Sequence, residues 1–171
     1  RLGPTATEAA LKQDPRLGGA GIIAIATHGL LPKEVGRNTE PGLVFTPPAT
    51  ASVEDDGLLT ASEAARLSLN ADWLILSACN TAASDGTPGS QSLSGLGRAF
   101  LHAGAKALLA SHWRVSDEVT AVLTVETMRL SRSGLSKAEA LRQAMIAVRT
   151  GKRANGTALP GWKEFWAHPA A

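Results

Sequence analysis

Three short apolar runs limit what this sequence can fold into. They are "GIIAIAT" at 21–27, "DWLILSA" at 72–78 and "KALLASHW" at 106–113. Their apolar residues are mostly consecutive instead of alternating with polar ones, which is typical of strands buried on both faces of a parallel sheet. Segments with helical signals separate the runs, and this alternation predicts an α/β fold with a mainly parallel sheet covered by helices.

Helix starts are marked three times by a Ser or Thr followed three residues later by Glu. In this capping box, each side chain accepts a hydrogen bond from a main-chain N–H that the first helical turn leaves free. The pairs are Thr5–Glu8, Thr60–Glu63 and Ser136–Glu139. The expected helices cover residues 5–13, 60–69, 92–103, 116–131 and 136–150. In the last of them, the spacing predicts a buried stripe of Ala138, Leu141, Met145 and Val148.

The connection between Gly29 and Thr60 is long and rich in Pro and Gly. It contains one short extended candidate, "GLVFT" at 42–46. An insert of this length in a compact domain is typically functional, so we expect either a hairpin that faces a substrate or a partly disordered segment.

The composition of the 171 residues excludes several classes of protein. Hydrophobic residues make up 44% and charged residues 19%, as in ordinary globular domains. The net charge of +2 comes without a basic run, so no nucleic-acid partner is expected. No apolar run approaches the roughly 20 residues that span a bilayer, so we expect no membrane segment and a cytoplasmic protein. The four histidines and one cysteine show no metal-ligand spacing, so no metal or other cofactor is expected.

The first two apolar runs end on reactive side chains. His28 follows the first run, and Cys79, the single cysteine of the chain, follows the second. In open parallel α/β sheets, ligands bind beyond the carboxyl ends of the strands, and neighbouring strands lie about 4.8 Å apart. If these two strands are neighbours, the thiol and the imidazole face each other across a crevice. A lone cysteine is otherwise commonly a small buried apolar side chain.

A thiol beside an imidazole suits nucleophilic catalysis. The pKa of a free cysteine is about 8.5, and a neighbouring imidazolium lowers it by stabilising the thiolate. His28 would then act as general base and later as general acid. The main-chain N–H groups of Gly29 and Cys79 could line an oxyanion hole, and Gly29 lets a substrate approach closely because it has no Cβ.

An ordered set of motifs resembles a known family. Cys79 lies 51 residues after His28, and caspases place their histidine about 50 residues before the nucleophile. The caspase signature Gln-Ala-Cys is absent, because Ser77 and Ala78 precede the cysteine. Most of the chain nevertheless resembles the CHAT domain, a caspase-like peptidase domain of clan CD that is often fused to tetratricopeptide repeats. The motifs are "ATEAAL" at 6–11, "IATHG" at 25–29, "DDGLLTASEAARL" at 55–67, "DWLILSACNTA" at 72–82, "LGRAFLHAGAKALLASHWRVSDEVT" at 96–120 and "AEALRQA" at 138–144.

The resemblance implies a caspase-like three-layer sandwich over residues 1–171, with His28 and Cys79 as the catalytic dyad of a cysteine endopeptidase. It also implies protein or peptide substrates and regulation by an attached or separate tetratricopeptide-repeat partner, in a bacterial signalling, cell-death or antiviral setting. CHAT domains usually have strand material before "ATEAAL" and an apolar segment after the "HP" at 168–169. This chain has neither, so we expect a piece of a longer protein.

The tract "SHWRVSDE" at 111–118 resembles the one that lies beside the substrate pocket of caspases and separases. An inward-pointing Arg114 would select an acidic residue before the cleaved bond, and an inward-pointing Asp117 a basic one. Trp113 is a candidate wall of this pocket, and Asp85 is a further candidate anion. The sequence leaves the choice between them open.

Two rival interpretations stand beside the peptidase. In the first, the domain is a CHAT-type scaffold whose crevice binds a peptide or protein partner without cleaving it. In the second, the same dyad serves another thiol hydrolase or an acyltransferase.

Overall fold

The computed structural model describes residues 2–30, 40–52, 54–77, 95–111 and 116–161. Main-chain contacts divide the chain into two compact units, Arg1–Arg114 and Val115–Ala171. In the described part of the chain, both sheets belong to the first unit, whereas the second contains two long helices and the turn after them.

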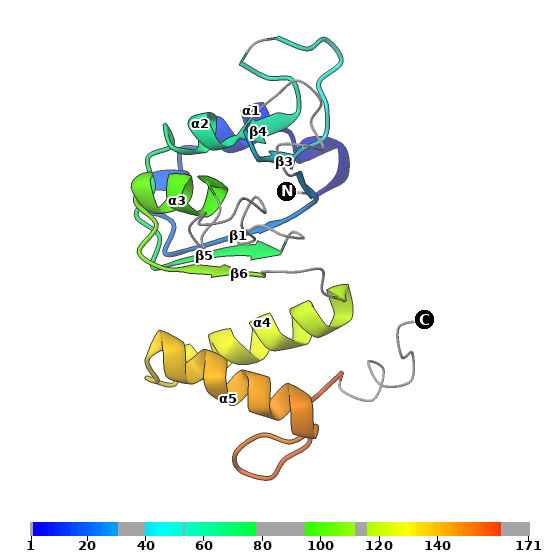
Figure 1. Ribbon diagram of the computed structural model, residues 1–171, viewed down its shortest axis with the longest axis vertical. Helices are drawn as coiled ribbons and strands as arrows, with labels where there is room; N and C mark the ends of the chain where they lie inside the picture. Colours follow the sequence, from blue (N-terminus) through cyan, green and yellow to red (C-terminus); the bar gives the residue numbers. More distant parts are fainter. Residues whose placement is uncertain (1, 31–39, 53, 78–94, 112–115, 162–171) are drawn as a thin grey trace, which may run out of the picture. The chain divides into compact units, whose positions relative to one another are not determined.

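A parallel sheet forms the centre of the first unit. Its strands are β1 (Ile22–Ala26), β5 (Trp73–Ser77) and β6 (Leu108–Ala110), in the order β1-β5-β6 (Figure 1). All of its pairs are parallel, and each strand falls inside one of the three apolar runs. The α/β fold class with a parallel sheet is therefore confirmed.

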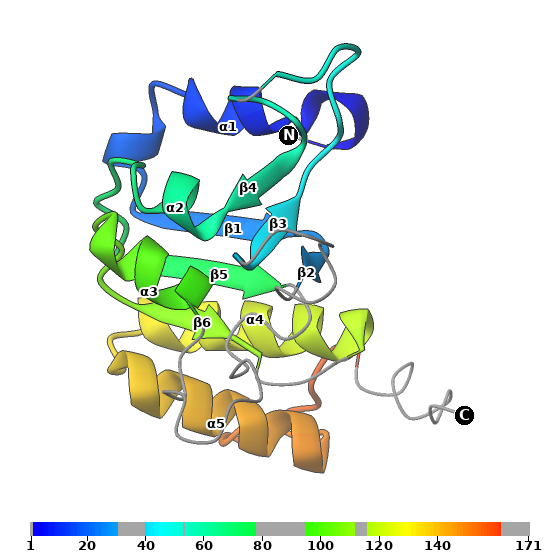
Figure 2. The same cartoon turned by 45° about the horizontal axis from the view of Figure 1, so that its top comes forward.

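The long connection after β1 builds a second, antiparallel sheet. It consists of β2 (Gly29–Leu30), β3 (Gly42–Val44) and β4 (Leu58–Thr60), in the order β2-β3-β4 (Figure 2). The extended segment expected at 42–46 is confirmed, since β3 lies within it. The remaining elements of this unit are η1 (Gly3–Thr5), α1 (Glu8–Lys12), η2 (Leu17–Gly19), α2 (Ala61–Ala64) and α3 (Gly95–His102).

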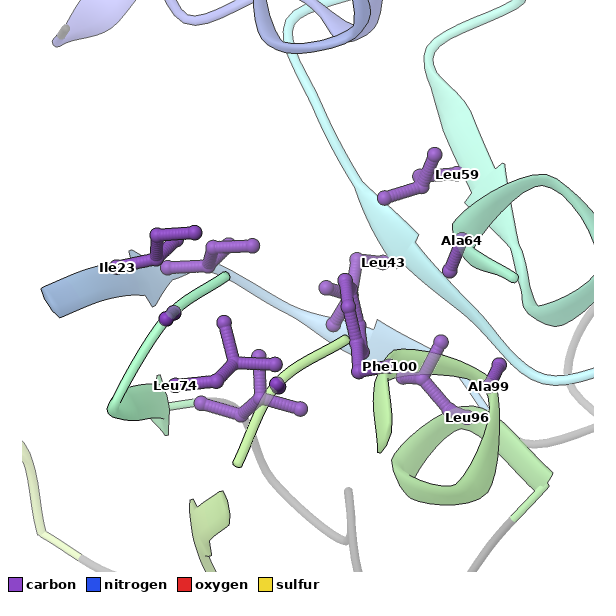
Figure 3. Packing of buried hydrophobic residues seen from close by; sticks show 12 residues of the cluster. Ile23, Leu43, Leu59, Ala64, Leu74, Leu96, Ala99 and Phe100 are labelled. Atoms are coloured by element: carbon purple, nitrogen blue, oxygen red, sulfur yellow. The ribbon is translucent and has the colours of Figure 1, made fainter. Parts of the chain in front are cut away.

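One hydrophobic cluster joins the two sheets to the helices. Leu74 of β5 and Leu43 of β3 are both 0% exposed, and Phe100 of α3 is 1% exposed (Figure 3). Each such side chain contributes about 1.5–3 kcal/mol when it leaves water. Residues of both sheets belong to this core, so packing fixes the position of the end of β1 relative to the start of β2.

The strands of the parallel sheet differ in burial. Residues 73–76 of β5 are buried on both faces, as expected. The same expectation is wrong for β1, where Ile23 and Ile25 are buried but Ile22 is 41% exposed. It is also wrong for β6, whose three residues are only half-buried. In the described part of the chain β1 is an outer strand, and its second face lines a groove of about 770 Å³ beside α1.

The first expected capping box is wrong. Thr5 lies in η1, and its hydroxyl donates a hydrogen bond to the carbonyl of Leu2. Thr7 caps α1 instead, because its side chain accepts from the N–H of Ala10. The helix therefore runs over Glu8–Lys12 and not over 5–13.

The other two capping signals do mark the start of a helix. Thr60 and Glu63 form a complete capping box, although the helix they start ends at Ala64 and not at 69. Ser136 caps its helix by accepting from the N–H of Glu139, but the Glu139 carboxylate binds Arg142 and Gln143 instead of closing the box.

Glu8 has a different role from the one its spacing indicated. Its side chain is 0% exposed, and one carboxylate oxygen accepts hydrogen bonds from the N–H groups of Asp56 (3.2 Å) and Gly57 (3.1 Å). The other oxygen pairs with the ammonium of Lys12, which also pairs with Glu63 at 2.8 Å. Burial alone would lower the pKa of Lys12, but its hydrogen bonds to Glu63 and Glu8 outweigh that effect and raise it. The carboxylate thus ties α1 to the turn before β4.

A Schellman motif ends α3. The N–H of Gly104 donates to the carbonyl of Leu101, and the N–H of Ala105 donates to that of Phe100, both at 3.1 Å. Gly104 has a φ of 109°, and a Cβ on it would lie 2.2 Å from the carbonyl oxygen of Leu69. The chain can turn from α3 into β6 here only because residue 104 has no side chain.

The second unit is a pair of packed helices, α4 (Asp117–Arg132) and α5 (Lys137–Thr150). The stripe expected on α5 is wrong, since Met145 is 56% exposed. The buried residues are Ala140, Ala144 and Ala147, and the first two belong to one cluster with Leu130 of α4. Small side chains allow the two helix main chains to approach closely, which favours the alanine face over the larger apolar one.

Glu126 of α4, which is 2% exposed, connects α4 to the turn after α5 through its carboxylate. It pairs with Arg129 one turn further on at 2.6 Å and with Arg153 in the turn after α5 at 3.1 Å. The hydrogen bond from Arg129, joined by that from Arg153, outweighs the effect of burial and lowers the pKa of Glu126.

We expect Gly104→Ala to lower the free energy of unfolding by about 3–5 kcal/mol, because the new Cβ meets the Leu69 carbonyl in a strained main-chain conformation. Urea unfolding followed by circular dichroism measures this. Gly3→Ala is the control, since Gly3 has a φ of 54° but nothing within 4 Å of a built Cβ, and it should cost only about 1 kcal/mol. Equal losses in both variants would contradict the close approach to Leu69.

Glu126→Gln should lower stability at pH 7 by about 1–2 kcal/mol, because an amide cannot replace the charged bonds to both arginines. The folded-state pKa of Glu126 lies below the ordinary value of 4.5. Its contribution is therefore present above that pH and is lost as the pH falls through the folded-state pKa. Unfolding curves between about pH 7 and pH 3 should show a smaller acid loss in the variant than in the wild type.

Glu139→Gln serves as the control for Glu126, because its pair with Arg142 lies on the surface of α5. Solvent screens such pairs, so this variant should have the smaller effect at pH 7. An effect as large as that of Glu126→Gln would mean that burial adds nothing to the Glu126 pairs.

Candidate functional site

Two residues, Thr27 and His28, connect the parallel sheet to the antiparallel one. The last pair of β1 with β5 is Ala26 with Ser77, and the first residue of β2 is Gly29. The N–H of Thr27 donates to the carbonyl of Ser77 at 3.3 Å, which is the last described hydrogen bond between β1 and β5. This two-residue junction is where the sequence placed the candidate histidine.

The antiparallel sheet holds the other side of the junction. The hydroxyl of Thr27 donates to the carbonyl of Val44, and the N–H of Val44 donates to the carbonyl of His28 at 2.9 Å. The main chain at His28 is therefore bonded on the β3 side, while its side chain is exposed. An exposed imidazole on a fixed main chain can exchange protons with a bound molecule.

Gly29 presents its main-chain N–H away from β3. Gly29 pairs with Leu43, and the hydrogen bond next to this pair joins His28 to Val44. Gly29 and Leu43 are therefore a non-hydrogen-bonded pair of the antiparallel sheet. In such a pair, the N–H and C=O groups of each residue point away from the partner strand. The orientation suits the expected oxyanion-hole role, because the donor lies one residue after His28 and is not used by the neighbouring strand.

Four of the expected site residues lie outside the described residues. They are Cys79, Asp85, Trp113 and Arg114. Asp117 is described as the exposed first residue of α4, and it belongs to the second compact unit. Of the expected site residues, the structure thus describes His28 and Gly29 at the junction and Asp117 in α4, and the roles of all of them stay predictions.

Thr27 is the residue that reasoning from the sequence missed. Burial alternates along β1, and Thr27 continues the side of the strand that carries the buried Ile23 and Ile25. A hydroxyl at the end of such a series needs a hydrogen-bond partner nearby. The sequence signal that could have identified Thr27 is a hydroxyl residue at the end of an apolar strand, directly before the histidine.

Within the described ranges, no group of three or more His, Cys, Asp or Glu side chains is arranged to hold a metal ion. Over the same ranges, no helix combines the length and the apolar character needed to cross a membrane.

The parallel sheet and its helices form an α/β domain that is consistent with a caspase-like fold. The family model of the CHAT domain matches residues 1–171, the whole chain. The chain therefore belongs to the CHAT domain family, which is related to caspase-like proteases. A comparison with curated proteins gives no significant match.

We expect the amide of Gly29 to exchange with solvent deuterium about tenfold faster or more than that of Val44, after correction for intrinsic rates, because only Val44 donates to the neighbouring strand. Hydrogen exchange followed by NMR measures both amides in one sample. Equal protection of the two would show that the Gly29 N–H is already bonded and unavailable to an oxyanion.

Proposed function

We propose that this domain is a cysteine endopeptidase in which Cys79 is the nucleophile and His28 the general base and acid. The observation that carries the proposal is the register of the parallel sheet. Ile22 pairs with Trp73 and Ala26 with Ser77, an offset of 51 residues at both ends of β1. Cys79 follows His28 by the same 51 residues.

Two more residues in the same register, beyond the last described pair of Ala26 with Ser77, would place His28 opposite Cys79. Paired residues of parallel strands project to the same face of the sheet, and adjacent strands lie about 4.8 Å apart. An imidazole and a thiol in register would therefore meet at the carboxyl edge, where open α/β sheets bind their ligands. The bond from the Thr27 N–H to the Ser77 carbonyl supports the proposal, since it keeps the chain in the parallel sheet up to the residue before His28.

The reaction follows from these positions. The imidazole takes the thiol proton, and the thiolate sulfur attacks the carbonyl carbon of the scissile peptide. The oxygen of the tetrahedral intermediate becomes negative and accepts hydrogen bonds from the N–H groups of Gly29 and Cys79. The carbon–nitrogen bond then breaks, the imidazolium gives its proton to the leaving amine, and a thioester remains on Cys79.

Water completes the cycle. The neutral imidazole of His28 takes a proton from a water molecule, whose oxygen attacks the thioester carbon. The thiolate leaves and the product carboxylic acid is released. The scheme uses only protein groups and water, so we propose no cofactor.

Substrate choice is proposed to depend on the tract after β6. Arg114 would pair with an acidic side chain before the cleaved bond, whereas Asp117 or Asp85 would pair with a basic one, and Trp113 would pack against either. Protein or peptide substrates and a tetratricopeptide-repeat regulator are the partners we propose.

The dyad is tested without any substrate by alkylating Cys79 with iodoacetamide over about pH 5 to 9. Since Cys79 is the single cysteine, intact mass reports its reaction alone. We expect fast alkylation to persist below pH 8, and His28→Ala to slow it by about tenfold or more at pH 6. His102→Ala is the matched control, because His102 is an exposed histidine at the end of α3, and it should leave the profile unchanged.

An ordinary thiol profile that His28→Ala does not alter would contradict the dyad and favour the scaffold interpretation. A His28-dependent profile without peptide cleavage, but with cleavage of small esters, would favour another thiol hydrolase. Cys79→Ala should abolish cleavage and leave partner binding intact.

A further inference from the structure

Thr27 bonds to both sheets at the junction, through its main chain on one side and its side chain on the other. Its N–H donates to the carbonyl of Ser77, which is two residues before Cys79 in the sequence, and its hydroxyl donates to the carbonyl of Val44. A single residue therefore connects the end of β5 to the end of β3. The residue that follows it is His28.

Val44 closes the arrangement on the β3 side. Its carbonyl accepts from the Thr27 hydroxyl, and its N–H donates to the carbonyl of His28 at 2.9 Å. These two bonds lie on either side of the peptide between Thr27 and His28. Together they restrict the rotation of the main chain that carries the imidazole.

Threonine suits this position for two reasons. Its branched Cβ restricts χ1, so that the hydroxyl is held in few orientations. Its hydroxyl supplies a donor, which valine of almost the same shape does not. Without that donor, the partly buried carbonyl of Val44 would lose a bond that a rigid strand end does not easily replace.

We propose that Thr27 is a positioning residue that orients the imidazole of His28 toward the nucleophile, an inference that rests on the proposed function. It acts through the main chain of His28 and does not touch the substrate. Removing its hydroxyl leaves His28 present but removes one of the two bonds to Val44 that restrict its main chain.

The test compares three variants in the iodoacetamide assay. Thr27→Val should lose about tenfold or more of the His28-dependent alkylation rate at pH 6, because a displacement of about 1 Å is enough to cost this much. Thr27→Ser should retain most of the rate, since it keeps the hydroxyl. Thr46→Val is the matched control, because the Thr46 hydroxyl donates to the carbonyl of Gly3 at 2.9 Å two residues beyond Val44, and it should keep the wild-type profile.

The outcomes separate this inference from the proposed function. If the wild type shows a His28-dependent profile and Thr27→Val keeps it, the positioning role is wrong and the dyad stands. If Thr27→Ser and Thr46→Val lose as much as Thr27→Val, the loss reflects general destabilisation and the positioning role is again wrong.

If the alkylation rate of the wild type does not depend on His28, the proposed function fails. The effect of Thr27 is then measured directly on the mobility of the His28 ring. NMR relaxation of the His28 ring should then show greater ring mobility in Thr27→Val than in the wild type and Thr27→Ser. Hydrogen exchange at Val44 should also become faster in the valine variant alone. Unchanged ring mobility and exchange would overturn the inference.

Discussion

The pairing of β1 with β5 is the constraint on which the first unit depends. Parallel strands cannot be joined by a tight turn, so the chain between them has to cross over before it returns. In this protein the crossover, residues 27–72, contains the whole antiparallel sheet and α2. The register of this pairing also decides which residues share the carboxyl edge, so the same contact determines both the path of the chain and the position of the candidate site.

His28 belongs to neither sheet and is held by both. Its neighbour Thr27 bonds to Ser77 of the parallel sheet, and Val44 of the antiparallel sheet bonds to His28 itself. The imidazole projects to solvent from this support. A reactive side chain gains accuracy when rigid elements hold its main chain, because less ordering is then needed when a substrate binds. Placing the histidine between two sheets achieves this without burying it.

The sequence predicted elements that depend on local patterns and missed those that depend on distant contacts. The apolar runs identified β5 correctly, because consecutive apolar residues reflect burial on both faces. They did not reveal that β1 exposes Ile22, because the sequence of a strand does not show which elements pack against its two faces. Glu8 matched a capping signal, yet the N–H groups that bond to its carboxylate are those of Asp56 and Gly57, almost 50 residues away. His28 and Gly29 could be proposed from their place after a strand, whereas the role of Thr27 required the position of Val44.

The buried Glu8 carboxylate restricts where this chain can change in length. It binds the N–H groups of Asp56 and Gly57, and Gly57 itself has a φ of 88° with its Cβ position 3.0 Å from Pro47. Extra residues between 55 and 57 would break these bonds. Residues 49–51 are exposed, and lengthening the loop there would add only the slowly growing entropy of a longer loop. We therefore expect added residues to be tolerated at 49–51, whereas a single residue added between 55 and 57 would remove both main-chain bonds to the Glu8 carboxylate.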